Sequence, residues 1–433
     1  MTIETNTLLE MDDLPPFSRI RVEEVTPALD EVLAANRKGV AQLLLEAGES
    51  PTWESLLAPL EGLEDRLNRL WSPVSHLNGV MNSPELRQVV DDAQLKLSDY
   101  WTEMGQNEAL YHAYRRIRES EAFSRLDCAQ QRVIDNALRD FRLSGIALPA
   151  AEKERYKSMM AELSQLTTRY SNNLLDATNG WHKGLAAETL LAGVPHSGRA
   201  LMRQAAESAG EEGWRITLDF PSYFAIITHA DNRELRQEIY CAYTTRASDQ
   251  GPQAGQWDNS PLMEQILHIR YELAQLLGFN SYAERSLATK MAEDPEQVLT
   301  FLRDLARRAL PMARQELQEV TVFAKEQGLA EPLQAWDMSY YSEKLRQSRY
   351  AISQEDLRPY FALPRVVEGL FALVERLFGV SVSPASADLW HKDATFYEIY
   401  DGAGGIRGRF YLDPYARQKK RGGAWMDVAL ARR

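Results

Sequence analysis

Histidine side chains, which can bind a metal ion or act as a catalytic base, are few in this sequence of 433 residues. The seven histidines are His76, His112, His182, His196, His229, His268 and His391. None belongs to an H-E-x-x-H segment, in which two imidazoles one helical turn apart bind zinc beside a general-base glutamate. The nearest approach is His268 with Glu272. Because a zinc site needs three protein ligands, this pair predicts a contact on a helix surface, and we expect neither a metal site nor a catalytic residue in this chain.

Other catalytic patterns are also missing from the sequence. Gly402, Gly404 and Gly405 do not complete G-x-G-x-x-G, because Arg407 stands where the third glycine belongs. The context of these glycines is strand–turn–strand, which offers no helix N-terminus to a phosphate, so they predict a hairpin turn. No G-K-[ST] or G-x-S-x-G segment occurs. Cys128 and Cys241 have no catalytic context, and two reduced thiols are the simplest interpretation.

The charge distribution argues against nucleic acid and membrane partners. The formal net charge is -13, which repels phosphate backbones and anionic lipid surfaces. One basic run, Arg417 with Lys419, Lys420 and Arg421, is short and predicts a solvated loop. No apolar run reaches the ~20 residues that span a bilayer. The segment Met1–Asp13 lacks the pattern of a secretory signal, so we expect a soluble, cytoplasmic protein. We also expect a monomer.

Helical periodicity dominates the chain, and 44% of its residues are hydrophobic, enough for a large core. Strand signals are confined to Trp214–Ile227 and to a hairpin over Thr395–Leu412. Two polar or small-residue segments, Ala187–Arg199 and Asp249–Ser260, predict linkers. Two expected helices end at a glycine, Met263–Leu277 before Gly278 and Pro364–Phe378 before Gly379. A third helix is expected to begin at Asp294-Pro295.

Several blocks then resemble one known family. Trp336 to Leu345 reads W-D-M-S-Y-Y-S-E-K-L, and Phe410 to Arg417 reads F-Y-L-D-P-Y-A-R, followed by K-R-G-G-A-W over Lys420–Trp425. These segments, with R-P-Y-F at Arg358–Phe361 and L-P-P-F at Leu14–Phe17, are similar to the thimet oligopeptidase family of zinc metallopeptidases. The blocks occur in the family's order and cover essentially the whole chain.

The resemblance implies a mostly α fold, an incomplete two-lobed helical channel of the kind found in zincin-type oligopeptidases, with a small β element near the C-terminus. It also implies zinc-dependent hydrolysis of short peptides. The family's H-E-x-x-H ligands are expected beyond Arg433, so we expect a truncated or fragmentary chain that binds no zinc and is inactive alone. The alternative is a non-enzymatic helical fragment that binds a peptide or a protein partner.

Three regions are predicted: a helical region over 1–145, a helical lobe of the substrate channel over 146–394, and the start of a catalytic lobe over 395–433. In zinc peptidases an extended substrate commonly adds to a sheet edge through backbone hydrogen bonds. The residues predicted to bind substrate are Gly408, Phe410, Gly422, Gly423, Ala424 and Trp425. Gly422 and Gly423 either permit close backbone approach or only close a turn. Tyr340 and Tyr341 are expected to pack between the lobes and not to contact substrate, because aromatic pairs usually belong to cores.

Overall fold

A computed structural model describes residues 6–11 and 13–431. Residues 1–5 and Asp12 of the segment Met1–Asp13, together with Arg432 and Arg433, therefore lie outside the described residues. No helix in the described part of the chain combines the length and the apolar character that crossing a lipid bilayer requires.

The structure is mostly helical, as predicted. The helices are α1 (Val22–Ala47), α2 (Ala58–Val80), α3 (Pro84–Gly105), α4 (Glu108–Glu119), α5 (Cys128–Leu143), α6 (Ala150–Gly180), α7 (His196–Ser208), α8 (Phe220–His229), α9 (Arg233–Thr244), α10 (Ser260–Leu276), α11 (Tyr282–Leu287), α12 (Pro295–Glu326), α13 (Ala335–Tyr350), α14 (Gln354–Leu357) and α15 (Leu363–Phe378). The strands are β1 (His182–Leu185), β2 (Trp214–Thr217), β3 (Ser381–Pro384), β4 (Thr395–Tyr400) and β5 (Ile406–Leu412).

The predicted start of α12 and the predicted end of α15 are both observed. The Asp294 side chain accepts a hydrogen bond from the Gln297 backbone N–H and Pro295 follows it, so α12 begins where the sequence indicated. At the other end of α15, Gly379 adopts a left-handed conformation with φ of 64° and donates its N–H to the Glu375 carbonyl. Such a C-terminal stop favours glycine because a Cβ is strained at positive φ.

Two small antiparallel sheets interrupt the helices. β1 pairs with β2, and the second sheet has the order β3-β4-β5, with β4 and β5 forming the predicted hairpin. The prediction of a strand over Trp214–Ile227 is correct only as far as Thr217. From Phe220 the chain is helical, because Pro221 occupies the first turn of α8, where a missing N–H costs nothing.

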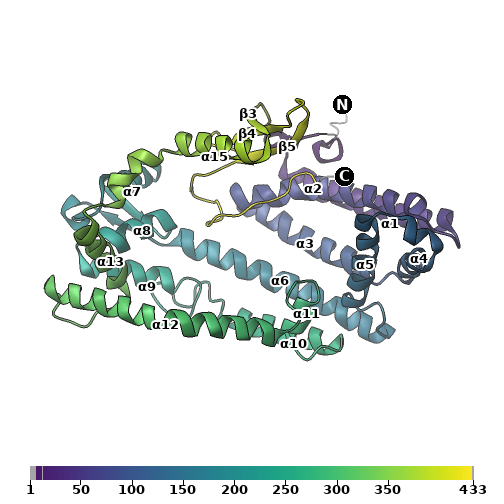
Figure 1. The fold of residues 1–433 in the computed structure, drawn as a ribbon, viewed down its shortest axis with the longest axis horizontal. Helices are drawn as coiled ribbons and strands as arrows, with labels where there is room; N and C mark the ends of the chain where they lie inside the picture. Colours follow the sequence, from purple (N-terminus) through teal and green to yellow (C-terminus); the bar gives the residue numbers. More distant parts are fainter. Residues whose placement is uncertain (1–5, 12, 432–433) are drawn as a thin grey trace.

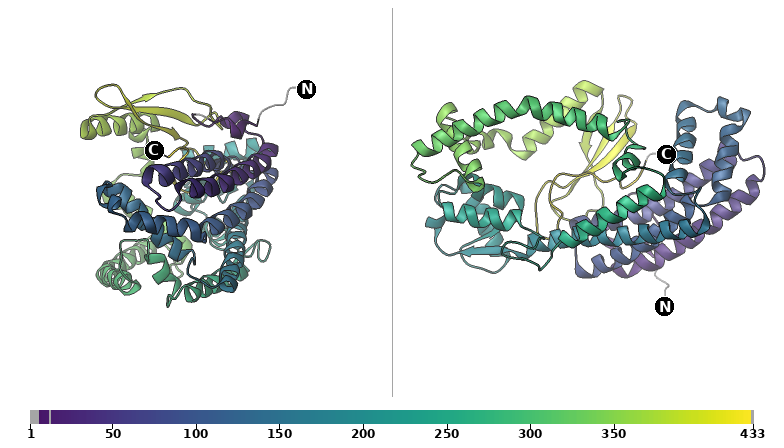
Figure 2. Two further views of the ribbon diagram at one scale, coloured as in Figure 1. Left: turned by 90° about the vertical axis from the view of Figure 1, so that its right-hand side faces the viewer. Right: turned by 90° about the horizontal axis from the view of Figure 1, so that it is seen from below.

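The elements form two helical groups at opposite ends of the molecule (Figure 1). Helices α1–α5 lie at one end, α7–α9 and α13 at the other, and the long α6 runs between them. The sheet β3-β4-β5 lies above, beside the start of α1 and the end of α2, and α12 spans the lower edge (Figures 1 and 2). The largest core is built by α1, α2 and α3, and it includes Trp390 and Ala394 from the segment before β4.

The interpretation of Ala187–Arg199 as a linker is wrong in part. Its residues Glu188–Leu191 form a 3-10 turn, and α7 begins at His196. Leu191 and Val194 are buried in the core of α7–α9, so this segment packs instead of spanning solvent. The division of the chain at residues 145 and 394 stays a prediction.

Candidate functional site

A cavity of about 1200 Å³ lies where the C-terminal sheet meets the N-terminal helices. Its walls come from five parts of the fold: the segment around Phe17, the second half of α2, the start of α8, Trp390 before β4, and the chain from Ile406 to Leu430. All six residues that the sequence predicted to bind substrate line this one cavity: Gly408, Phe410, Gly422, Gly423, Ala424 and Trp425. Sequence reasoning missed the walls given by α2 and α8, because these residues carry no recognisable motif.

Strand β5 forms one wall and is an edge strand. It pairs with β4 on one side, and within the described residues no strand pairs with its other side. An unpaired strand edge presents a row of backbone N–H and C=O groups. An extended peptide in the cavity can therefore add to the sheet as a further antiparallel or parallel strand.

The backbone groups that face the open edge of β5 follow from the register. Phe396 of β4 accepts a hydrogen bond at its carbonyl from Ala385, on the β3 side of the sheet. The backbone N–H and C=O of one strand residue point to the same side, and those of the next residue point to the opposite side. Because the groups of Phe396 point toward β3, its pair with Tyr411 makes no hydrogen bonds between β4 and β5. The N–H and C=O of Tyr411, and those of Arg409 two residues earlier, consequently face outward.

An aromatic cluster forms the floor of the cavity. The Trp390 ring lies 4.9 Å from Phe17 and 4.3 Å from His76, measured between ring centroids, and Trp425 lies 5.6 Å from His76. The arrangements are edge-to-face or tilted, which suits the ring quadrupoles. Phe17 and Trp390 are buried in the core, so His76 and Trp425 are the members of this cluster that stay partly exposed along the cavity.

Beneath this cluster Asp413 collects three hydrogen-bond donors. Arg417 binds both of its carboxylate oxygens at 2.8 Å, Lys420 lies 3.0 Å from Oδ1, and the Trp390 indole N–H donates to Oδ2 at 2.9 Å. Burial acts to raise the pKa of Asp413, but the hydrogen bonds from Arg417, Trp390 and Lys420 outweigh it and lower the pKa. The interpretation of the basic run as a solvated loop is thus wrong for Arg417 and Lys420, which are largely buried because they neutralise this carboxylate.

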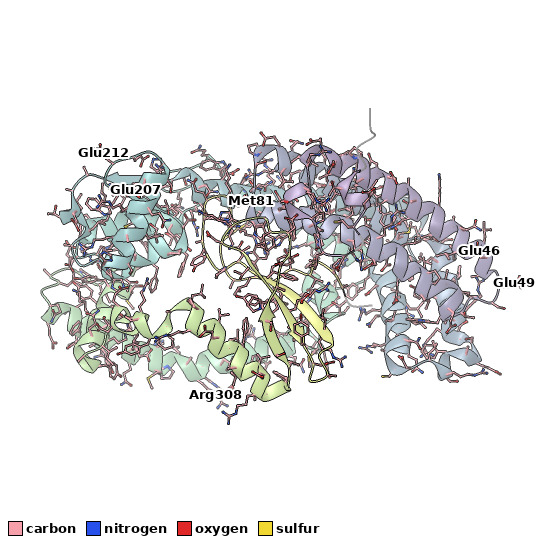
Figure 3. The ribbon with its side chains drawn as sticks, turned by 90° about the horizontal axis from the view of Figure 1, so that it is seen from above. Glu46, Glu49, Met81, Glu207, Glu212 and Arg308 are labelled. Carbon is pink, nitrogen blue, oxygen red and sulfur yellow. The ribbon has the colours of Figure 1, made fainter. Side chains whose placement is uncertain are left out.

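The segment after Asp413 is held against the end of α2 by backbone contacts. Arg421 donates its N–H to the Gly79 carbonyl at 2.8 Å, and Asn82 donates to the Lys419 carbonyl at 3.2 Å. Figure 3 shows these parts of the chain together near the labelled Met81. Gly423 has a φ of 89° and open space around its Cβ position, so the backbone conformation there favours glycine.

His76 is the one imidazole of the cavity wall among the described residues. Its Nδ1 lies 3.5 Å from an Asp427 carboxylate oxygen, and its Nε2 is buried without a hydrogen-bond partner in the described structure. Burial lowers the pKa of His76 below its ordinary value of 6.5, and Asp427 offsets this in part. The imidazole is therefore neutral in the folded chain at pH 7.

This lowered pKa predicts a pH dependence of stability. Below about pH 6.5 the unfolded chain binds a proton at His76 that the folded chain binds only at lower pH. The contribution of the neutral imidazole to the free energy of unfolding is therefore fully present above pH 6.5 and is lost as the pH falls from 6.5 through the folded pKa. We expect His76→Gln to flatten the dependence of unfolding midpoint on pH between about 5 and 7. Urea titrations at several pH values measure it, with His268→Gln on the exposed surface of α10 as the control. Equal slopes for the parent chain and His76→Gln would contradict the assignment.

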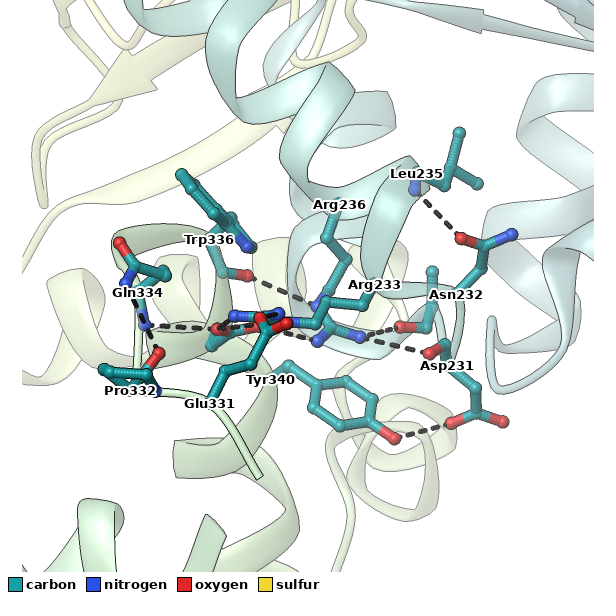
Figure 4. Close-up of polar contacts among 12 residues, drawn as sticks. Asp231, Asn232, Arg233, Leu235, Arg236, Glu331, Pro332, Gln334, Trp336 and Tyr340 are labelled. Atoms are coloured by element: carbon teal, nitrogen blue, oxygen red, sulfur yellow. Dashed lines mark hydrogen bonds and ion pairs between the residues drawn. The ribbon is translucent and has the colours of Figure 1, made fainter. Parts of the chain in front are cut away.

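The W-D-x-x-Y-Y motif lies on α13, in the helical group with α7–α9 (Figure 1), and Figure 4 shows polar contacts around it. Asp337 is fully buried, Arg236 is only 1% exposed, and their side chains meet at 2.9 Å. Arg233 binds the same carboxylate, also at 2.9 Å, and the Tyr340 hydroxyl donates to Asp231 at 2.8 Å. Hydrogen bonds from Arg233 and Arg236 lower the pKa of Asp337, although burial alone would raise it. The motif joins α9 to α13. Tyr341 is buried in the core shared by α12 and α13, and Tyr340 packs against that core.

The described residues include no cluster of side chains that could bind a metal ion. Among residues 6–11 and 13–431 no group of three or more histidine, cysteine, aspartate or glutamate side chains is placed to hold an ion. The predicted surface pair His268–Glu272 is observed at 3.4 Å on α10, and Arg155 also binds Glu272. The described residues therefore offer no set of side chains that fits a zinc ion.

Comparison with known proteins assigns the family. Residues 226–433 match the sequence profile "Peptidase family M3", and residues 29–153 match "Neurolysin/Thimet oligopeptidase, N-terminal domain". The chain belongs to peptidase family M3. Within this family it is similar to oligopeptidase A of Salmonella typhimurium and of Escherichia coli, each 51% identical over 98% of this chain. The organellar oligopeptidase A of Arabidopsis thaliana is 40% identical over 100% of the chain.

The relatives are longer than this chain. The alignment spans 62% of each bacterial oligopeptidase A and 55% of the Arabidopsis protein. The resemblance drawn from the W-D-x-x-Y-Y and G-G-A-W segments is thus confirmed, and the relatives have further sequence that this chain does not match.

Among solved structures, a chain titled "PZ PEPTIDASE A with inhibitor 2" is 14% identical, with a TM-score of 0.46 over 75% of this chain and 48% of that one.

Proposed function

We propose that this chain supplies the peptide-binding part of an oligopeptidase that hydrolyses short peptides. The observation that carries the proposal is the edge strand β5 along the wall of a cavity with an aromatic floor. Backbone pairing is tolerant of sequence, which suits an enzyme that acts on many short peptides. The 51% identity to proteins named oligopeptidase A supports the reaction class.

The catalytic part of the reaction is proposed to need residues that this chain does not contain. The family resemblance implies zinc, which activates a water molecule and polarises the scissile carbonyl when it is bound. The sequence has no H-E-x-x-H segment, so we propose that the chain alone hydrolyses no peptide at an appreciable rate. What its own residues do is bind and orient: β5 aligns the peptide backbone, and the aromatic floor shields one face of the peptide from water.

A cytoplasmic location and a monomeric state stay predictions. The thiols of Cys128 and Cys241 are both free in the structure, which suits a reducing compartment. The exposed Cys128 would be the more readily oxidised of the two.

Backbone N-methylation of a peptide ligand tests the binding mode. A peptide strand paired with β5 points every second N–H toward the protein, so methylating those alternate nitrogens removes its hydrogen bonds and blocks close approach. We expect the affinity of a six-residue apolar peptide for the chain to fall at least about tenfold on methylation in one alternating register. Isothermal titration calorimetry measures the affinities.

The same peptide methylated in the other alternating register is the matched control, because it has the same composition and hydrophobicity. Its affinity should stay within about threefold of the parent peptide. Equal losses in both registers, or saturable binding that neither pattern affects, would rule out pairing with β5.

A further inference from the structure

Helix α8 gives the cavity one of its walls, through Asp219, Phe220 and Pro221 at the start of the helix. The apolar residues Ala225 and Ile226 farther along are buried in the core that α8 shares with α7 and α9. Phe220, by contrast, keeps 58% of its surface exposed. Figure 1 shows the chain after β5 reaching down beside α8, so this phenyl ring is presented to the cavity from the far helical group.

The Phe220 ring is supported from behind by other rings. Its centroid lies 5.6 Å from that of Phe224 and 6.5 Å from that of Tyr223. Tyr223 is in turn stacked on Tyr243 of α9, with their centroids 3.9 Å apart. Pro221 fixes the backbone in the first turn of the helix. A ring held in this way loses little conformational freedom when a ligand packs on it, so more of the contact free energy remains as affinity.

The other rings along the cavity are more fully occupied by neighbours within the protein. Phe410 is stacked on Tyr397, with their centroids 5.2 Å apart, and the Arg421 guanidinium lies 4.3 Å from the Trp425 ring centroid. Phe220 is the most exposed aromatic side chain of the cavity wall. Single exposed rings are common on protein surfaces. What distinguishes Phe220 is that it combines free apolar surface, a place on the cavity wall and a rigid support.

We propose that Phe220 is a specificity-determining residue, which selects peptides that carry a bulky apolar side chain at one position of the bound segment. Pairing with β5 recognises the peptide backbone, so by itself it distinguishes side chains poorly. Successive side chains of a bound strand point to opposite faces, and one that reaches Phe220 removes apolar surface of both groups from water. The inference deepens the proposed function and rests on it, because it requires a peptide in the cavity.

A positional scan of the ligand tests the inference. Six-residue peptides of valine and threonine, acetylated and amidated, carry either alanine or phenylalanine at each position in turn. Isothermal titration calorimetry gives their affinities for the chain. We expect one position at which phenylalanine binds at least about tenfold more tightly than alanine.

Substitution of Phe220 should remove this preference without affecting recognition of the backbone. Phe220→Ala should reduce the preference at that position to within about threefold, whereas Phe220→Leu, which keeps a large apolar side chain, should retain most of it. The alanine-containing peptide should bind the parent chain and Phe220→Ala with affinities within about threefold, which shows that the variant is folded and that β5 is intact.

Phe301→Ala on α12 is the matched control, because Phe301 is exposed to a similar extent, 63%, and the cavity wall is left unchanged. The preference for phenylalanine should persist in this variant. A preference that survives Phe220→Ala would overturn the inference, as would equal affinities for phenylalanine and alanine at every position. In the second case, affinity that still falls on alternate N-methylation would leave the proposed function standing. The absence of saturable binding by every peptide would reject both.

Discussion

Replacing Asp337 by alanine should lower the free energy of unfolding by about 3–5 kcal/mol, because it leaves two arginine side chains without their shared carboxylate. Arg236 is the critical one, since it is 1% exposed and its guanidinium charge cannot reach water without opening the packing between α9 and α13. Guanidinium chloride unfolding followed by circular dichroism measures the change.

A matched control is available in the same cluster. Glu331 also binds Arg233, but its side chain is largely exposed, and ion pairs of that kind contribute about 0–1 kcal/mol. Glu331→Ala should therefore change stability far less than Asp337→Ala. Similar losses for both variants would show that the cluster is no more than a surface network, and the W-D-x-x-Y-Y motif would need another physical explanation.

Removing the carboxylate of Asp413 should destabilise the wall of the cavity by a similar amount. Asp413→Ala leaves Arg417 and Lys420, both largely buried, without a counter-charge and the Trp390 indole N–H without an acceptor, at a cost of about 3–5 kcal/mol. Because Arg417 also donates to the Val80 carbonyl of α2, we expect the segment that contains Gly422 to Trp425 to detach from α2. Hydrogen exchange of α2 and the segment after Asp413 measures this, and peptide affinity should fall with it.

Asp393→Ala is the control for Asp413. The Asp393 side chain is partly exposed and lies 3.5 Å from His391, a contact that adds little in water. We expect its effect on unfolding to stay within about 0.5 kcal/mol and peptide affinity to be unchanged. If Asp413→Ala left exchange in the segment unaltered, the carboxylate would not be what holds this wall in place.

The sequence by itself determined the local elements and the family. Asp294 with Pro295 specified the start of α12 and Gly379 the end of α15, because capping depends on residues within one turn. The hairpin of β4 and β5 followed from its glycine-rich turn for the same reason. By contrast, the helix at Phe220 was missed, since alternation over a few residues does not distinguish a strand from a helix that begins at Pro221.

Only the tertiary structure decided what these elements build together. The six predicted substrate residues share one cavity because the chain after β5 returns to α2, and no local pattern encodes that return. The same folding gave Arg417 and Lys420 a buried partner, where the sequence indicated a solvated basic loop. Charge, burial and unpaired strand edges depend on neighbours that are distant in sequence. For this reason the open edge of β5 along the cavity became visible only in three dimensions.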